Sequence, residues 1–366
     1  MKKNFILFFL IFSFSFNISV LSAMEEDNLY VLFEQVPKQS VDSISTEDVA
    51  IIILKAINVL DKNLRVANDN NKISLYYKTR LIKSLYKPKD RNDAKLWADL
   101  AGNIFDMAIN VSSKAKKYDF EAFDNIMLYA IKDMGKDAKY FIGGENRSLL
   151  KQKRTFAARM EEENLYIKIG IFNKFLYDEI INALNEHKQA NGIILDLRGC
   201  PGGQLSAAID VADVFLDQGI IASVKGKPNE EIIYYNAKEG GVGENADVVV
   251  LVDGDTASAA EVLAQALQDQ GRAKVVGTKT FGKGSIQNLI DLPNGSAISV
   301  TSAYIYAPSG QKLSDFGVIP DVCTFEMPES KDENRLINAP KNDNCLAESR
   351  SDSLLDEKIA QILLKR

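Results

Sequence analysis

The chain has 366 residues, with 44 Lys or Arg and 50 Asp or Glu, so its formal net charge at pH 7 is −6. Its basic residues are scattered along the sequence, and they do not form the clusters with which a nucleic-acid-binding protein contacts phosphates. We therefore expect no nucleic-acid partner. The length allows one large domain or two modest ones, each with a buried core.

Residues 1–23 are predicted to be a secretory signal peptide. Two lysines precede an apolar run from Phe5 to Leu21, and the small residues Ser22 and Ala23 follow that run. A basic start, an apolar stretch and a small-residue end are the layout of an export signal. The alternative is an uncleaved membrane anchor, because the run approaches the length that spans a bilayer. We expect a periplasmic or otherwise extracytoplasmic protein that contacts a membrane only through this segment.

Residues 24–111 are predicted to form a helical N-terminal region. Apolar residues recur there at three- and four-residue spacing, for example from Leu96 to Met107, and the asparagine-rich segment near Asp69 predicts a break. Residues 112–164 are expected to add a helix over Phe120–Met134 and a linker.

Residues 165–325 are predicted to be an α/β core, and 326–366 a C-terminal tail. The patterns give strands at Leu165–Ile171, Gly192–Arg198, Ile220–Val224, from Asp247 and at Lys274–Gly277, with helices at Lys174–His187, Leu205–Leu216 and Ala259–Gln270. Strands that alternate with helices indicate a mixed, largely parallel sheet. The tail is expected to be solvated up to an apolar pattern near Leu354, where a short helix is predicted.

Ligands of such folds bind at the carboxyl ends of strands, and three distinctive segments lie at such ends. The first segment is DGDTASAAE, in which Ser258 begins a helix. A helix N-terminus offers unpaired N–H groups and the positive end of the helix dipole, which favour a serine nucleophile and an oxyanion. The alternative is a purely structural capping box formed by Ser258 with Glu261.

The second segment is TFGKGSIQ, where two glycines flank Lys283. Gly277, four further residues and then Gly282-Lys283 nearly spell a phosphate-binding P-loop, but that loop needs Ser or Thr directly after its lysine and then a helix. Here Gly284 follows Lys283, and the next residues alternate as a strand does, so we reject nucleotide binding. A lysine acts as a base only when its amine is neutral. A solvated turn lysine is the alternative interpretation.

The third segment is DLRGCPGG, which ends in Gly202 and Gly203. Without a Cβ, glycine lets the backbone approach a ligand closely, so these N–H groups are candidate oxyanion donors. A plain tight turn is the alternative.

His187 is the only histidine of the chain, and it lies in an amphipathic stretch where a solvated helical position is expected. A Ser-His-Asp triad would have to use it.

Together, DLRGCPGG, TASAAEVLAQALQDQGRAKVVG and TFGKGSIQ resemble the core of the C-terminal processing (tail-specific) peptidases, a family of Ser-Lys endopeptidases with a crotonase-like fold. The segment AYIYAPSGQKLSDFGVIPDV resembles that family's closing strands. The resemblance implies that Ser258 is the nucleophile, Lys283 the general base and Gln287 the residue that positions the lysine. It assigns the oxyanion hole to the N–H groups of Ala259 and of a glycine in the pair Gly202–Gly203. It implies protein or peptide substrates and no cofactor.

The sequence departs from the family pattern at several points. Thr256 stands where the family usually has serine, and Cys200 where it usually has asparagine. The family also commonly carries a PDZ domain, whereas only the link Gly135–Asn164 separates the flanking segments here. This link is shorter than a domain, so we expect no PDZ domain and no capture of substrate tails by one. The N-terminal region is instead expected to serve docking or homo-oligomerisation.

The three cysteines are Cys200, Cys323 and Cys345. An exported protein can pair two of them, and we expect Cys323 with Cys345, which would tether the tail to the core; three free thiols are the alternative. No CxxC motif or His/Cys cluster indicates a zinc site.

Two other functions stay open at this point. The same fold can host a catalytically inactive peptide- or ligand-binding protein. A crotonase-like acyl-transfer or hydratase enzyme would share the architecture, but it would not require Ser258 and Lys283 together.

Overall fold

The computed structural model describes residues 27–118, 121–143, 156–241, 246–325, 327, 337, 345–349 and 353–365. The predicted signal peptide lies outside this part of the chain. The chain divides into two compact units: the first comprises Met1–Leu150 and Gln287–Ser302, and the second comprises Lys151–Ile286 and Ala303–Arg366. Within the described ranges, no helix is both long enough and apolar enough to span a membrane.

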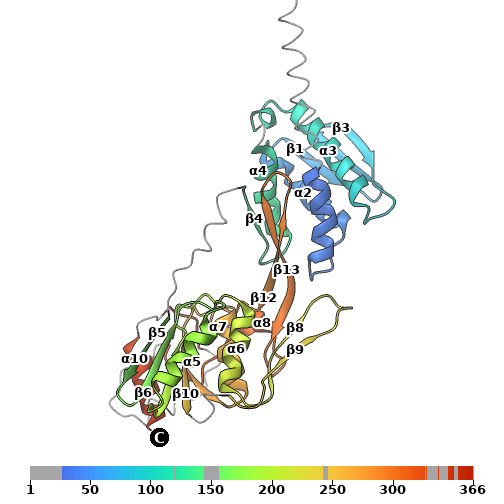
Figure 1. The fold of residues 1–366 in the computed structure, drawn as a ribbon. Helices are drawn as coiled ribbons and strands as arrows, with labels where there is room; N and C mark the ends of the chain where they lie inside the picture. The colour runs from blue at the N-terminus through green and yellow to red at the C-terminus, as the bar shows by residue number, and fades with distance from the viewer. Residues whose placement is uncertain are drawn as a thin grey trace, which may run out of the picture. The chain divides into compact units, whose positions relative to one another are not determined.

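The first unit combines helices with short strands (Figure 1). Its helices are α2 (Thr46–Lys55), α3 (Ala94–Val111) and α4 (Ala122–Ala130), with short 3-10 helices η1 (Ala56–Val59), η2 (Ala115–Lys117) and η4 (Ile131–Asp133). Its strands are β1 (Leu64–Asn68), β2 (Lys72–Tyr77) and β3 (Arg80–Tyr86), which form an antiparallel sheet, and β4 (Lys139–Phe141), which pairs with Ala297–Ser299.

The purely helical N-terminal region predicted for residues 24–111 is wrong between Leu64 and Tyr86. Alternate residues of β1 and β2 face the core, among them the fully buried Ile73 and Leu75, as the period of two in a strand requires. The asparagine-rich segment does not separate two helices. It reverses the chain between β1 and β2, and the Asp69 N–H donates to the Lys72 carbonyl at 3.0 Å.

The second unit is built on a six-stranded sheet in the order β14-β11-β10-β7-β6-β5. Its strands are β5 (Phe156–Glu161), β6 (Asn164–Ile169), β7 (Gly192–Asp196), β10 (Asp247–Val252), β11 (Ala273–Gly277) and β14 (Val322–Cys323). All neighbours pair in parallel except β5 and β6. The predicted α/β fold with a mixed, largely parallel sheet is confirmed.

Helices cover both faces of this sheet (Figure 1). The helices α5 (Leu176–Glu186), α6 (Leu205–Phe215) and α7 (Ala259–Asp269) share one apolar core with alternate strand residues, such as Leu195. The intervening strand residues, such as Ile194, pack with α10 (Leu354–Leu364) on the other face. Strands β7 and β10 are therefore apolar on both sides, as expected for a parallel sheet covered twice.

The remaining strands belong, together with β4, to a third sheet. They are β8 (Ile220–Lys225), β9 (Ile233–Asn236), β12 (Ser285–Asp291) and β13 (Ala297–Tyr306). Within the second unit, Tyr304–Tyr306 of β13 pairs antiparallel with β8, and the short helix α8 (Leu313–Phe316) follows.

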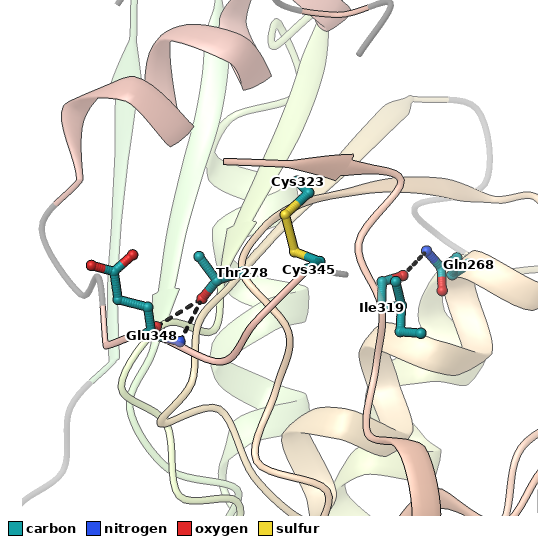
Figure 2. Close-up of a disulfide and its surroundings, with 6 residues drawn as sticks. All are labelled: Gln268, Thr278, Ile319, Cys323, Cys345 and Glu348. Atoms are coloured by element: carbon teal, nitrogen blue, oxygen red, sulfur yellow. Dashed lines mark hydrogen bonds between the residues drawn. A yellow bond between two sulfur atoms is a disulfide. The ribbon is translucent and has the colours of Figure 1, made fainter. Parts of the chain in front are cut away.

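The C-terminal segment is less solvated than predicted. Figure 2 shows the disulfide between Cys323 and Cys345, and it shows Glu348 bonded through its backbone to the Thr278 hydroxyl. The Glu348 carbonyl also accepts the N–H of Gly254 at 2.6 Å, which fixes residues 345–349 on the core. The expected solvated tail is therefore wrong for this stretch, whereas the helix predicted near Leu354 is confirmed as α10.

Candidate active site

Ser258 lies at the carboxyl end of β10, where it caps the N-terminus of α7 with φ 57° and ψ −121°. A positive φ is uncommon for a residue with a side chain, and such strain persists only where the surroundings hold it, frequently at active sites. Here the Ala257 N–H donates to the Cys200 carbonyl at 2.9 Å, and the Ser258 N–H donates to Glu261 Oε2 at 2.8 Å. Ser258 is thus held in a sharp strand-to-helix turn by contacts on both sides.

The loop that leads to Ser258 is fixed by the buried side chains of Asp253 and Thr256. Asp253 Oδ1 accepts the N–H groups of Gly199 at 2.9 Å and Thr256 at 3.0 Å, so it joins this loop to the DLRGCPGG turn. The Thr256 hydroxyl donates to the Leu197 carbonyl at 3.0 Å. Threonine therefore supplies a structural hydroxyl where the family usually has serine.

The carboxylate of Glu261 is fully buried and accepts four hydrogen bonds. Its Oε2 accepts the N–H of Ser258 at 2.8 Å and that of Lys283 at 2.7 Å. Its Oε1 accepts the N–H of Gly282 at 2.7 Å and the hydroxyl of Thr280. Burial raises the pKa of Glu261 above its ordinary value, although these donors act in the opposite direction. The structure thus brings the backbones of Ser258 and Lys283 to one oxygen atom.

The turn that carries Lys283 is tight, as the flanking glycines predict. Gly282 has φ 84°, and a Cβ on Gly284 would lie 2.4 Å from the Ser314 nitrogen. The Lys283 side chain is half-buried. Strand β12 follows this turn at Ser285, whereas a P-loop requires a helix there, so the structure agrees with the rejection of nucleotide binding.

The two glycines proposed as oxyanion donors have different surroundings. A Cβ on Gly202 would lie 2.7 Å from the Ser258 Cβ and 2.8 Å from the Ala259 nitrogen. A Cβ on Gly203 would instead lie 2.1 Å from the Phe172 carbonyl oxygen. Ala259 is the first residue of α7, where an N–H has no partner within the helix. The geometry thus brings Gly202 and Ala259 to Ser258, while Gly203 packs on the backbone of Phe172.

Gln287 and His187 are the remaining candidate residues from the sequence. Gln287 belongs to the first unit, where its side chain donates to Thr301 Oγ1 at 2.9 Å and accepts from Ser299 Oγ at 3.1 Å. His187 follows the end of α5, shortly before β7 begins. It therefore lies at the edge of the sheet where the parallel strands start, whereas Ser258 follows the end of β10.

The three cysteines divide into one disulfide and one buried thiol. Cys323 is joined to Cys345, and Cys200 is fully buried in the turn next to Ser258. Burial raises the pKa of the Cys200 thiol to about 11, so this thiol is protonated at neutral pH and is not a nucleophile. Its position is structural, since its carbonyl holds the Ala257 N–H.

Sequence reasoning missed two sets of contacts. Glu261 is visible from the sequence as a capping residue, but its bonds to Gly282 and Lys283 join segments about twenty residues apart. The sequence places Arg198 only at the end of a predicted strand and in the DLRGCPGG turn. In the structure it is buried and bonds Asp196 and Glu357, the latter on α10. Its signal in the sequence is a charged residue directly after a buried apolar strand.

Comparison with known proteins agrees with the fold. Residues 164–324 match peptidase family S41. A carboxy-terminal-processing protease of Bartonella bacilliformis is 35% identical over 178 residues, which are 47% of this chain and 41% of that protein. A carboxyl-terminal-processing protease of Synechocystis is 42% identical over 159 residues, or 43% of this chain and 36% of that protein. The chain thus matches about two fifths of the length of these relatives.

Among solved structures, a lipoprotein from Streptococcus agalactiae has the same fold at 14% identity, with a TM-score of 0.54 over 81% of this chain and 91% of that one. The fold and the sequence relatives indicate the class of serine-type peptidases. More narrowly, the segment from residue 164 to 324 matches peptidase family S41, and the resemblance to the C-terminal processing peptidases is confirmed.

Proposed function

We propose that this chain is an exported serine endopeptidase that hydrolyses peptide bonds of proteins through a Ser258–Lys283 dyad and an acyl-enzyme. The observation that carries the proposal is the convergence of the Ser258 and Lys283 amides on one carboxylate oxygen, within a segment that matches a peptidase family. Export rests on the signal predicted at residues 1–23.

In the first step, Lys283 acts as the base and takes the proton of Ser258 Oγ while that oxygen attacks the carbonyl carbon of the peptide bond. The negative charge that develops on the carbonyl oxygen is stabilised by the N–H groups of Ala259 and Gly202 and by the N-terminus of α7. The carbon–nitrogen bond then breaks, and Lys283 gives its proton to the leaving amine. The new amino terminus departs, and the acyl group stays on Ser258.

In the second step, water attacks the acyl carbon and Lys283 takes one of its protons. The bond to Ser258 Oγ breaks, this oxygen regains a proton from Lys283, and the new carboxyl terminus is released. A single base thus serves both halves of the reaction, so the mechanism needs no histidine.

Two further roles belong to the same proposal. Gln287 is assigned to orient the lysine amine, and the N-terminal region is assigned to substrate docking or self-association. The second role follows from the expected lack of a PDZ domain, and the N-terminal region lies outside residues 164–324, which match the family. Substitution of Gln287 by Ala should lower kcat with little change in folding.

The proposal is tested by cleavage of unfolded casein and of a peptide library. We expect Ser258→Ala and Lys283→Ala to lose at least about 10³-fold in rate, because removal of a nucleophile or its base leaves only weak residual catalysis. His187→Ala is the matched control and should cleave as the wild type does. Cleavage retained by Ser258→Ala would reject the nucleophile. No cleavage by any form, wild type included, would favour a binding protein instead.

A further inference from the structure

Glu261 makes more contacts than the capping of its own helix requires. In a capping box the acid three residues after the N-cap accepts the N–H of the cap residue, as Glu261 does with Ser258 at 2.8 Å. Three more donors come from Thr280, Gly282 and Lys283, which are not part of α7. The carboxylate therefore joins the helix start to the turn between β11 and β12.

The capping box of α2 offers an internal comparison. There Asp48 accepts the N–H of Ser45 at 3.0 Å in the same relative position. The Asp48 side chain is 46% exposed and also contacts Arg91. A cap thus does not require burial, whereas Glu261 is fully buried and holds two segments of the proposed site.

The burial of a carboxylate is unfavourable unless each of its oxygens is well bonded. Each oxygen of Glu261 accepts two hydrogen bonds. Three of these four bonds come from the turn, so the buried carboxylate keeps its partners only while the turn stays in place. Thr280 strengthens the arrangement, since its hydroxyl also accepts the Val318 N–H at 2.7 Å. A shift of the turn would break several of these bonds together.

We propose that Glu261 is the positioning residue that holds the turn bearing Lys283 at a fixed distance from Ser258. This inference rests on the proposed Ser258–Lys283 mechanism and adds to it. Glu261 does not touch the substrate; it acts through the two backbone amides that it binds. Catalysis depends on such placement, because a displacement of about 1 Å can lower a rate about 100-fold.

The first test compares Glu261→Ala, Glu261→Gln and Asp48→Ala in steady-state cleavage. Glu261→Ala removes both acceptor oxygens and with them all four hydrogen bonds, and should lower kcat about 100-fold, with KM changed less than about threefold. Glu261→Gln keeps one oxygen for the amides of Ser258 and Lys283, but its NH₂ group faces the Gly282 N–H, so a smaller loss of about 10-fold is expected. Asp48→Ala removes a capping acid of the first unit; because docking by that unit would act on KM, kcat should stay unchanged.

The second test is amide hydrogen exchange followed by mass spectrometry, which needs no activity. In Glu261→Ala the peptide containing residues 280–284 should exchange at least about tenfold faster, while Asp48→Ala should leave it unchanged. Should Glu261→Ala fail to fold, Glu261→Gln supplies both measurements. A Glu261→Gln enzyme with the kcat and the exchange rate of the wild type would overturn the inference, as would Glu261→Ala with unchanged exchange in this turn. An inactive wild type would reject the peptidase function, and hydrogen exchange would still decide whether Glu261 holds the turn.

Discussion

Two buried carboxylates of the second unit, Asp196 and Glu261, are held in opposite ways. Both are fully buried, but Asp196 bonds Arg198 through both of its oxygens and lies 3.0 Å from the Lys168 amine. Burial disfavours the ionised form of Asp196, yet Arg198 and Lys168 outweigh it and lower the pKa. For Glu261, which is held by backbone N–H groups and a hydroxyl, burial prevails and the pKa is raised.

The difference separates a structural cluster from the candidate site. Arg198 also donates to the Ser353 carbonyl and to Glu357, both at 2.7 Å, and lies 3.5 Å from Asp356, so it fastens α10 to the end of β7. Glu261 instead joins two short turns that carry the proposed nucleophile and base. In this protein, the ion-paired cluster around Arg198 holds a helix against a strand, whereas Glu261, which binds backbone amides, fixes the positions of Ser258 and Lys283.

The largest effect on stability is expected from Arg198→Met. The substitution leaves Asp196, Asp356 and Glu357 without their shared cation, and breaking a buried ion pair in this way costs about 3–5 kcal/mol. Urea unfolding at pH 7 measures the loss. Arg159→Met is the control, because its ion pair with Glu161 is exposed and should contribute less than about 1 kcal/mol. Equal losses in the two variants would mean that the Arg198 cluster is not the fastening of α10.

A somewhat smaller effect is expected from Cys345→Ser. The disulfide closes a loop with a sequence separation of 22, and loops of this size give a stabilisation of about 3 kcal/mol. Loss of the tether should also loosen the bonds that Glu348 makes with Thr278 and Gly254. Thermal unfolding with and without a reductant measures the effect, and the reductant should destabilise the wild type only. A reductant effect of equal size in Cys345→Ser would contradict the assignment.

The smallest effect is expected in the pH dependence of stability that the Asp196–Arg198 cluster causes. Because the pKa of Asp196 is lowered in the folded state, its contribution to stability is complete above the unfolded value of about 3.9 and is lost as the pH falls through the folded pKa. In Arg198→Met, Asp196 stays buried and keeps only Lys168 as a cation, so its pKa should be higher than in the wild type and its protonation should cost the variant less stability. The difference in unfolding free energy between wild type and variant should therefore shrink from pH 7 to pH 4. A difference that stays constant over this range would exclude the electrostatic explanation.

The sequence predicts the second unit better than the first because its signals are local. In residues 165–277 the apolar runs are short, and the predicted strands and helices appear within a few residues of their expected ends. Between Leu64 and Tyr86 the apolar residues fit both the three- to four-residue period of a helix and the two-residue period of a strand. Only the pairing of three strands decides between the two structures.

In the candidate site, too, local features could be predicted from the sequence and contacts between distant segments could not. Ser258, Ala259 and Lys283 are found from motifs because each motif places its residues within one turn. The bond of Glu261 to Lys283 and that of Arg198 to α10 depend on how distant segments pack, which periodicity cannot show. The positioning role of Gln287 and the absence of a PDZ domain stay predictions; residues 144–155 of the link lie outside the described part of the chain.

The central claim is that Ser258 carries the acyl group during peptide-bond cleavage. It is tested most directly by mass spectrometry of the enzyme after rapid acid quenching during turnover of an activated ester of a short peptide. We expect the mass of the acyl group on the proteolytic fragment that contains Ser258, and no such adduct on Ser258→Ala. An acyl group on another residue, or an equally acylated Ser258→Ala enzyme, would contradict the claim.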